Sequence, residues 1–241
     1  MRYKCIVAYD GTSFHGFQVQ NDLRCVQLEL EKVLLVITKK KTKVYGAGRT
    51  DAGVHAYGQV FHFDFDVVMK EENMRNALNS RLPKDIYIRK VEHMDDKFHA
   101  RFSALAKTYE YLVDFGEVDP LKVNYRWYYK YSFDLDLLKQ AAKVFEGTHD
   151  FKAITKNHKL ENTIRTIYSI DFSVQDTLIK IRFRGNGFLH NQVRIMVAMM
   201  FEVARGKMRV CDLEKVLLSL DRKKAPKTAP PNGLYLMDIE Y

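Results

Sequence analysis

The order of strand-like and helix-like segments in its first half most limits what this 241-residue chain can fold into. Alternation of apolar and polar residues is typical of half-buried strands, and apolar residues three or four positions apart are typical of helices. These patterns predict a strand at 3–9, a helix at 26–37, strands at 42–45 and 58–66, a helix at 70–80 and a strand at 85–92. The order β-α-β-β-α-β is that of the split βαβ unit of ferredoxin-like folds.

The second half of the chain repeats this plan with additional segments. The patterns predict strands at 107–114, 125–131, 163–174 and 177–184, helices at 136–146, 189–204 and 211–220, and a last strand at 234–240. We therefore expect an α+β protein with two ferredoxin-like (β-α-β-β-α-β) subdomains of mostly antiparallel sheet, residues 1–104 and 105–241, flanking a central basic active-site cleft.

Composition removes several classes of protein. No apolar run reaches the 18 residues of a membrane span, and residues 1–4 lead into a strand pattern rather than a signal peptide. We therefore expect a cytoplasmic protein with no membrane partner. The three cysteines are widely spread and the eight histidines lack metal-ligand spacing, so the sequence predicts neither a disulfide framework nor a metal site.

The chain carries a net charge of +9, to which both halves contribute. Such a balance favours a polyanionic partner whose phosphates supply salt-sensitive affinity, although a solvated basic surface without a partner is an equal alternative. Basic residues cluster at 39–43, and aromatic rings alternate with cations at 126–131. One predicted strand adds an outward row of Lys180, Arg182 and Arg184, which either lies beneath RNA or faces water.

The segment from Gly46 to Ala56 places one carboxylate, that of Asp51, among three glycines. Glycine frees the backbone for left-handed turns and for close approach of another molecule, so Asp51 can sit at the edge of a cleft. Arg49 lies two positions earlier, and a permanent cation close by favours the ionised carboxylate. An anionic aspartate serves in catalysis as a nucleophile or as a general base.

Other interpretations of this loop remain open from its composition. An aspartate in a Gly-rich loop is commonly a turn residue whose side chain bonds its own backbone. A phosphate-binding metabolic enzyme would need Gly-x-x-x-x-Gly-Lys-Ser/Thr before a helix, whereas this loop lacks that pattern and leads into a strand. A non-catalytic RNA-binding protein on a ferredoxin-like platform is a third alternative, although the RNP1 pattern is absent.

Segments spread over nearly the whole chain match one known family in the same order. They are YDG at 9–11, GFQ at 16–18, GRTDAGVHA at 48–56, FHARFS at 98–103, KTYEY at 107–111, FLHNQVR at 188–194 and GLYL at 233–236. Together these segments resemble the bacterial tRNA pseudouridine synthase A family, in which the third is the signature loop.

The resemblance implies a cofactor-free isomerase that acts on uridine in the tRNA anticodon stem-loop, at positions 38, 39 and 40. Such an enzyme breaks the C1'–N1 bond, turns the uracil and rejoins it through C5. The resemblance further implies that Asp51 is the nucleophile and that Tyr109 stacks on the target base. Arg49 and Arg194 would be the cations around the aspartate. A homodimer with tRNA contacting both subunits is also implied, and attack at C1', attack at C6 and a glycal route all remain open.

Two of these residues also have an interpretation from pattern alone. Tyr109 alternates with Tyr111 and Val113, which is typical of a strand residue that faces the core. Arg194 lies in an apolar helix, where an unpaired buried cation is costly, so we expect it to pair with Asp51.

The chain departs from the family pattern at four positions. Phe17 stands where Trp is usual, Gln192 where Met is usual and Ala198 where Gly is usual. Ile154 occupies a position where an aromatic residue is common. None of these residues carries the expected chemistry, but they leave open a relative with altered RNA preference.

Overall fold

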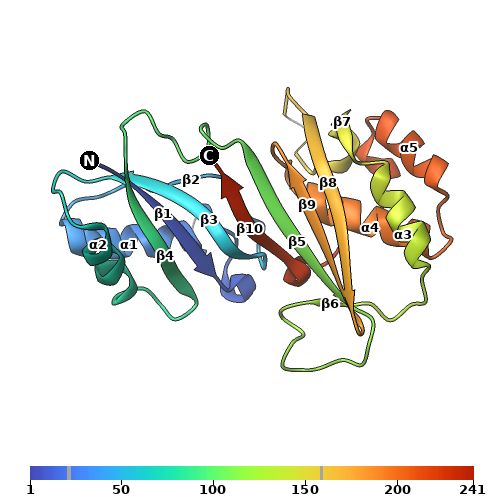
Figure 1. The fold of residues 1–241 in the computed structure, drawn as a ribbon, viewed down its shortest axis with the longest axis horizontal. Helices are drawn as coiled ribbons and strands as arrows, with labels where there is room; N and C mark the ends of the chain where they lie inside the picture. The colour runs from blue at the N-terminus through green and yellow to red at the C-terminus, as the bar shows by residue number, and fades with distance from the viewer. Residues whose placement is uncertain (21–22, 158–159) are drawn as a thin grey trace. The chain divides into compact units, whose positions relative to one another are not determined.

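The structure, a computed structural model, describes residues 1–20, 23–157 and 160–241 (Figure 1). The chain divides into two compact units, which are described separately below. The first unit comprises Met1–Leu105 with Tyr235–Tyr241, and the second comprises Ala106–Leu234. Both contain helices and strands, and most strand pairs are antiparallel. The predicted α+β class with mostly antiparallel sheet is therefore confirmed.

The sheet of the first unit is built on β1 (Arg2–Tyr9), which lies between β3 (His55–Asp64) and β4 (Ile86–Met94) and pairs antiparallel with both. The short strand β2 (Tyr45–Gly46) is antiparallel to β3, and β10 (Leu234–Glu240) is parallel to β3. From β1 to β4 the elements follow the predicted order β-α-β-β-α-β.

Two helices complete the core of the first unit. Helix α1 (Val26–Thr38) buries Val26, Leu30, Val33 and Leu34 but exposes Leu35 and Val36, and helix α2 (Glu71–Asn79) buries Met74 and Leu78. Helix α1 ends where Lys39 adopts a φ of 58° and its amide donates to the Leu35 carbonyl at 3.0 Å, a left-handed C-terminal cap. Strand β1 alternates buried and half-buried residues, so every second side chain faces the core.

The sheet of the second unit has the strand order β5-β9-β8-β7, and all three pairs are antiparallel. Its strands are β5 (Ala106–Asp114), β7 (Gly147–Asp150), β8 (Ile164–Gln175) and β9 (Leu178–Gly185). A fifth, short strand, β6 (Trp127–Tyr128), runs parallel to β5.

Two strands of this unit differ from the sequence prediction. The strand expected at 125–131 pairs only at Trp127–Tyr128, because the rings that follow pack together: Tyr129 lies 4.4 Å from Phe201 between ring centroids. Strand β7 was not predicted, since Gly147–Asp150 has no apolar alternation and owes its extended form to pairing with β8.

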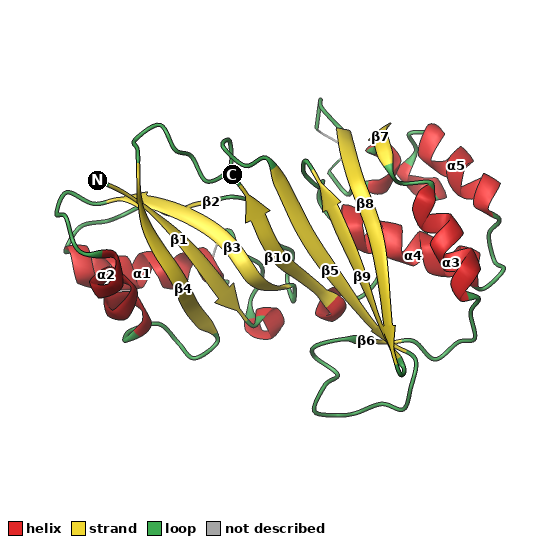
Figure 2. Cartoon of the chain, viewed as in Figure 1, coloured by secondary structure: helices red, strands yellow, loops and turns green. Residues whose placement is uncertain are grey.

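Three helices lie on one side of this sheet (Figure 2). They are α3 (Leu135–Lys143), α4 (Gln192–Ala204) and α5 (Val210–Leu218). Helix α4 is buried along its length except at Arg194 and Glu202. It begins three residues later than predicted because Asn191 takes a φ of 62°, which interrupts the helical backbone.

Single 3-10 turns connect several of these elements. They are Gly11–Ser13, Lys152–Ile154, Arg222–Lys224 and Pro231–Gly233. In the residues that the structure describes, no helix has the length and apolar character needed to cross a membrane.

Candidate active site

Asp51 lies in the loop that joins β2 to β3 in the first unit, which we call the aspartate loop (residues 47–54). The loop starts with two bonds to β3: the Ala47 amide donates to the Val60 carbonyl at 2.8 Å, and the Gln59 side chain donates to the Gly48 carbonyl at 3.0 Å. It ends in a turn, where the Val54 amide bonds the Asp51 carbonyl at 3.2 Å. The first end of the loop is therefore bonded to the sheet, and the second is closed by a turn that leads into β3.

Two glycines outside the loop let another backbone segment press against it. A Cβ atom on Gly11 would lie 2.1 Å from the Val54 carbonyl oxygen, and one on Gly16 would lie 2.4 Å from the Thr50 carbonyl oxygen. Gly16 also has a φ of 90°, which side chains disfavour. The Phe17 amide donates to the Thr50 carbonyl at 3.3 Å. Backbone therefore packs directly on backbone beside Asp51.

Thr50 orients the residues on either side of it. Its side chain is buried, and its hydroxyl lies 2.8 Å from the buried hydroxyl of Tyr9 on β1. Burial raises the pKa of Tyr9, while its bonds to Thr50 and Gln59 act in the opposite direction. With Thr50 held inside, Arg49 is exposed and Asp51 is half-buried. Both charged side chains are thus accessible from the same loop.

His55 is a further part of this site that sequence reasoning missed. Its ring is 2% exposed, accepts a hydrogen bond from the Gly11 amide at Nδ1 (3.0 Å) and stacks on Tyr235 with centroids 4.7 Å apart. It therefore ties the end of the aspartate loop to β10 and to the turn after β1. Its place four residues after Asp51 within the signature loop was the available signal.

Tyr109 and Arg194 belong to the second unit. Tyr109 lies on β5 opposite Phe183, is 8% exposed and meets Phe188 edge to face with centroids 5.1 Å apart. Arg194 is half-buried on α4. Its positive charge also reaches Tyr111: burial raises the pKa of that hydroxyl, and Arg194 offsets part of the rise. Tyr111 is thus a neighbour of Arg194 that pattern alone did not assign.

Arg194 holds an irregular segment that precedes β10, which we call the proline segment (residues 225–233). Its Nε donates to the Ala229 carbonyl at 2.8 Å, and the Ala229 amide donates to the Arg194 carbonyl at 3.2 Å. The Tyr111 hydroxyl donates to the Pro230 carbonyl at 2.7 Å. The structure therefore groups Arg49 with Asp51 in one unit and Tyr109 with Arg194 in the other, and the expected Asp51–Arg194 pair stays a prediction.

The outward basic row on β9 is partly balanced by acidic neighbours. Arg182 pairs with Glu110 at 3.0 Å and stands opposite Asp171 on β8. Arg184 lies over the ring of Tyr168 at 5.1 Å. Arg182 and Arg184 therefore have partners within the protein, which weakens the case for a polyanionic partner at this row.

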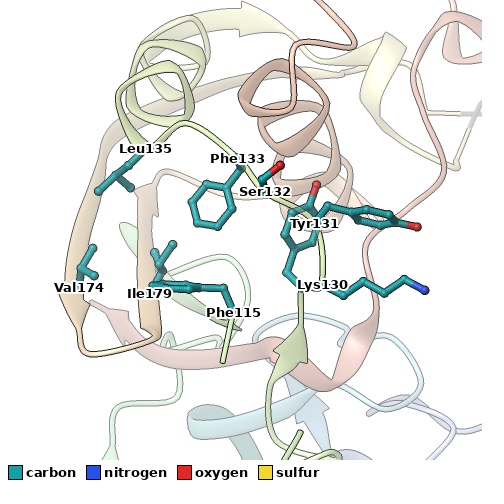
Figure 3. Close-up of a pocket in the computed structure, with 9 residues that line it drawn as sticks. Phe115, Lys130, Tyr131, Ser132, Phe133, Leu135, Val174 and Ile179 are labelled. Atoms are coloured by element: carbon teal, nitrogen blue, oxygen red, sulfur yellow. The ribbon is translucent and has the colours of Figure 1, made fainter. Parts of the chain in front are cut away.

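A pocket of about 460 Å³ lies elsewhere in the second unit (Figure 3). Aromatic and aliphatic side chains line it, and the four predicted site residues do not contribute to it. The lining residues are Phe115, Tyr129, Lys130, Tyr131, Ser132, Phe133, Leu135, Val174 and Ile179. Within the described ranges, His, Cys, Asp and Glu side chains form no group of three or more that could hold a metal ion.

Comparison with known proteins gives consistent matches over the chain. A family model described as tRNA pseudouridine synthase matches residues 5–103 and 141–241. A tRNA pseudouridine synthase A of Geobacillus sp. (strain WCH70) is 45% identical over 243 residues, covering 100% of this chain and 98% of the relative. The protein of that name from Limosilactobacillus reuteri (strain DSM 20016) is 46% identical, with coverages of 100% and 96%.

Two further comparisons differ in strength. The tRNA pseudouridine synthase A of Pseudothermotoga lettingae is 44% identical over 244 residues, covering 100% of this chain and 99% of the relative. Among solved structures, one described as a Cbf5-Nop10-Gar1 complex reaches a TM-score of only 0.36 at 13% identity, covering 82% of this chain and 54% of that one. The assignment of a family to this chain therefore rests on the sequence relatives and not on the Cbf5-Nop10-Gar1 complex.

Proposed function

The chain belongs to the tRNA pseudouridine synthase family, and from this premise we propose that it converts uridine to pseudouridine in tRNA. The targets are positions 38, 39 and 40 of the anticodon stem-loop, and Asp51 is the nucleophile. The observation that supports this best is the aspartate loop: a rigidly held loop that buries Thr50 and leaves Asp51 and Arg49 accessible.

The reaction needs no reactant besides the nucleoside and the protons exchanged with solvent. The C1'–N1 bond breaks and a C1'–C5 bond forms, while C5 releases a proton and N1 takes one up. In the two routes of nucleophilic attack, an Asp51 oxygen forms a covalent bond to the substrate and later leaves as carboxylate, so the aspartate is regenerated. The bond is made either at C1' or at C6, and the glycal route uses the same carboxylate to assist loss of uracil.

Arg49 has a separate task in this proposal. A uridine within a stem has to leave the base stack before C1' or C6 can be reached, and unstacking costs a few kcal/mol. Arg49 is exposed and only two positions from Asp51, so its guanidinium is suited to occupy the space that the base vacates. It would thereby hold the target nucleotide outside the stem while Asp51 reacts.

Tyr109 and Arg194 complete the site in this proposal. Tyr109 stacks on the extruded uracil, and its own ring is oriented by Phe188. Arg194, whose Nε is fixed on Ala229, pairs with Asp51 and keeps the carboxylate in position. We further propose that the two compact units, Met1–Leu105 with Tyr235–Tyr241 and Ala106–Leu234, form the basic cleft as two ferredoxin-like subdomains, and that the protein is a cytoplasmic homodimer that binds tRNA with both subunits.

Replacement of the nucleophile tests this function. Asp51→Asn keeps the size of the side chain and removes its charge, so we expect pseudouridine formation to fall by on the order of a thousandfold or more, with tRNA affinity nearly unchanged. Asp96→Asn is the matched control, because Asp96 is exposed on another loop of the same unit. Pseudouridine is mapped at single-nucleotide resolution in the treated tRNA. Undiminished product from Asp51→Asn would exclude the assigned nucleophile, and binding without product in the wild type would favour a non-catalytic RNA-binding protein.

A further inference from the structure

Four aromatic rings of the first unit form a continuous row of contacts, and the rings at the two ends of the row are exposed to water. Tyr45 stacks on His62 with centroids 4.9 Å apart, and His62 meets His99 at 4.7 Å with a steep angle of 67°. His99 in turn packs against Phe102 at 4.4 Å. We call these four residues the ring cluster. It joins β2 and β3 to the turn at 99–103, all within one unit.

The inner part of the ring cluster is fixed by hydrogen bonds. His62 is 1% exposed and its Nδ1 accepts from the Ala100 amide at 3.1 Å. Nδ1 of His99 accepts from the Arg101 amide at 3.1 Å, and the His99 amide donates to the Ser103 hydroxyl at 3.0 Å. The Ser103 amide closes the turn on the His99 carbonyl at 2.9 Å. The backbone that carries Phe102 is therefore held by contacts that do not involve the Phe102 side chain.

The outer part of the ring cluster presents aromatic surface to water. Phe102 is 76% exposed and Tyr45 is 39% exposed. Each of these rings has a cation beside it: the Arg101 guanidinium carbon is 5.6 Å from the Phe102 centroid, and the Lys43 ammonium is 5.2 Å from the Tyr45 centroid. A rigid exposed ring next to a cation is the combination by which proteins bind single-stranded nucleic acid, with the ring under a base and the cation on a phosphate.

The charges around the ring cluster favour a polyanion over an apolar partner. Lysines at 39, 40, 41 and 43 precede Tyr45 in the chain. Two carboxylates of the same unit are paired with cations, Asp64 with Arg2 at 2.8 Å and Asp66 with Lys40 at 2.6 Å, and Glu31 accepts from the Val44 amide at 3.0 Å. A protein partner that buried Phe102 would have to cover Arg101 and Lys43 as well, whereas a nucleotide uses rings and cations together.

We propose that the ring cluster is a second RNA contact, at which Phe102 and Tyr45 stack on an unpaired base of the tRNA while Arg101 and Lys43 contact the adjoining phosphates. The inference rests on the proposed function for the identity of the RNA. It adds a binding site that is distinct from the aspartate loop and that takes no part in bond breaking. Its role is to hold the substrate in place and to raise affinity.

Three variants of Phe102 and a control separate stacking from simple apolar contact. Phe102→Leu keeps apolar volume but lacks a π face, so we expect tRNA to bind about tenfold more weakly. Phe102→Trp retains the π face and should bind within about twofold of the wild type. Phe102→Ala should resemble the Leu variant. Val68→Ala removes another exposed apolar side chain of the same unit, at 66% exposure, and should leave binding unchanged.

The measurements are tRNA affinity at fixed salt and the rate of product formation at saturating tRNA. Because the proposal assigns the ring cluster to substrate binding, the loss in Phe102→Leu should appear in KM for tRNA rather than in kcat. A set of anticodon stem-loops, each with one loop base replaced by fluorescent 2-aminopurine, identifies the stacked base, whose quenching by the wild type is lost in Phe102→Leu. Arg101→Gln should lower the slope of log affinity against log salt by about one.

These experiments test the RNA contact at the ring cluster separately from the proposed synthesis of pseudouridine. Equal affinity of Phe102→Leu and wild type overturns it, as does an equal loss in the Leu and Trp variants, which would indicate a packing role. A salt slope unchanged by Arg101→Gln contradicts the phosphate contact. If the wild type binds tRNA and makes no pseudouridine, the proposed function fails, while loss of binding in Phe102→Leu alone would still support the stacking contact.

Discussion

The aspartate loop and the proline segment are both irregular backbone next to a predicted site residue, yet they are held in different ways. In the first, Gly11 and Gly16 let backbone approach backbone at positions where a Cβ atom would lie 2.1 and 2.4 Å from a carbonyl oxygen. In the second, the side chains of Arg194 and Tyr111 donate to backbone carbonyls at 2.8 and 2.7 Å. The aspartate loop therefore depends on close backbone contact in addition to its hydrogen bonds, whereas side-chain donors hold the carbonyls of Ala229 and Pro230 in the proline segment.

This difference predicts how each region responds to a single substitution. A steric exclusion acts in full as soon as one methyl group is added, because a carbonyl oxygen cannot be compressed and the surrounding backbone has to move. A hydrogen bond contributes about 1 kcal/mol net, so losing one weakens the contact and leaves the rest in place. We therefore expect the aspartate loop to be intolerant of single substitutions and the proline segment to lose its order gradually.

The largest effect is expected for Gly16→Ala. Gly16 combines a φ of 90° with a Cβ position 2.4 Å from the Thr50 oxygen, so the added methyl group both strains the backbone and displaces the loop. We expect a loss of roughly 2–4 kcal/mol in the free energy of unfolding. Activity should fall by about a hundredfold, since small misplacements of reacting groups have effects of that order. Urea unfolding and pseudouridine assays measure the two quantities.

Gly206→Ala is the control for the cost of placing an alanine at a positive φ. Gly206 has a φ of 70°, but no atom lies within 4 Å of its Cβ position. This variant should therefore lose only about 1 kcal/mol and retain full activity. If Gly16→Ala and Gly206→Ala lose the same amount, the close approach to Thr50 contributes nothing and the contrast between the two regions is wrong.

The structure also separates the features that could be predicted from the sequence from those that could not. Helix α1 and strand β1 follow from apolar periodicity within a single segment, and the aspartate loop follows from its glycines and from the family resemblance. The contacts of Gly16 with Thr50 and of Arg194 with Ala229 could not be predicted, because each joins residues that are distant in sequence and leave no periodic signal. Strand β7 was missed for a related reason, since its extended form comes from its partner β8.

The site residues show the limit of residue patterns more directly. By alternation alone, Tyr109 is a core-facing residue, and at 8% exposure it is indeed buried. Only the family resemblance assigns it to the substrate, and that role stays a proposal. His55 carried a signal in the loop motif but no pattern of its own, because its position depends on the Gly11 amide and on Tyr235, which fold next to it from opposite ends of the chain.

Acid should weaken the first unit before the proline segment. Burial, together with Arg2 and His99, lowers the pKa of His62 to about 4 from an ordinary value near 6.5. Between these values the unfolded chain binds the proton that the folded protein excludes, so the free energy of unfolding falls as pH falls from 6.5 toward 4. The loss should reach about 2 kcal/mol at pH 5. The proline segment contains no histidine.

Hydrogen exchange at pH 7 and pH 5 distinguishes the two regions. Amides of β3 should lose protection at pH 5, whereas the amide of Ala229 should change little. His62→Gln removes the titrating ring, and the slope of stability between pH 6.5 and 5 should flatten accordingly. A slope equal to that of the wild type would mean that other groups cause the acid sensitivity.

Arg194→Lys should loosen the proline segment without unfolding the second unit. Lysine keeps the charge but has no Nε fork, so the bond to the Ala229 carbonyl is lost or lengthened. We expect about 1–2 kcal/mol of destabilisation and faster trypsin cleavage after Lys227, which lies in the segment. Arg209→Lys, with a side chain that is 75% exposed, should change stability by less than about 0.5 kcal/mol. Cleavage at the wild-type rate in Arg194→Lys would show that the segment is held elsewhere.

The smallest effect is expected for Tyr111→Phe, which removes only the bond to the Pro230 carbonyl, and it is the most informative when combined with Arg194→Lys. Alone it should lose about 1 kcal/mol. If Arg194 and Tyr111 hold one segment that detaches as a unit, the second substitution has little left to release, and the double variant loses less than the sum of the two. Strict additivity in urea unfolding would instead mean that Ala229 and Pro230 are anchored independently, and that the proline segment is as locally rigid as the aspartate loop.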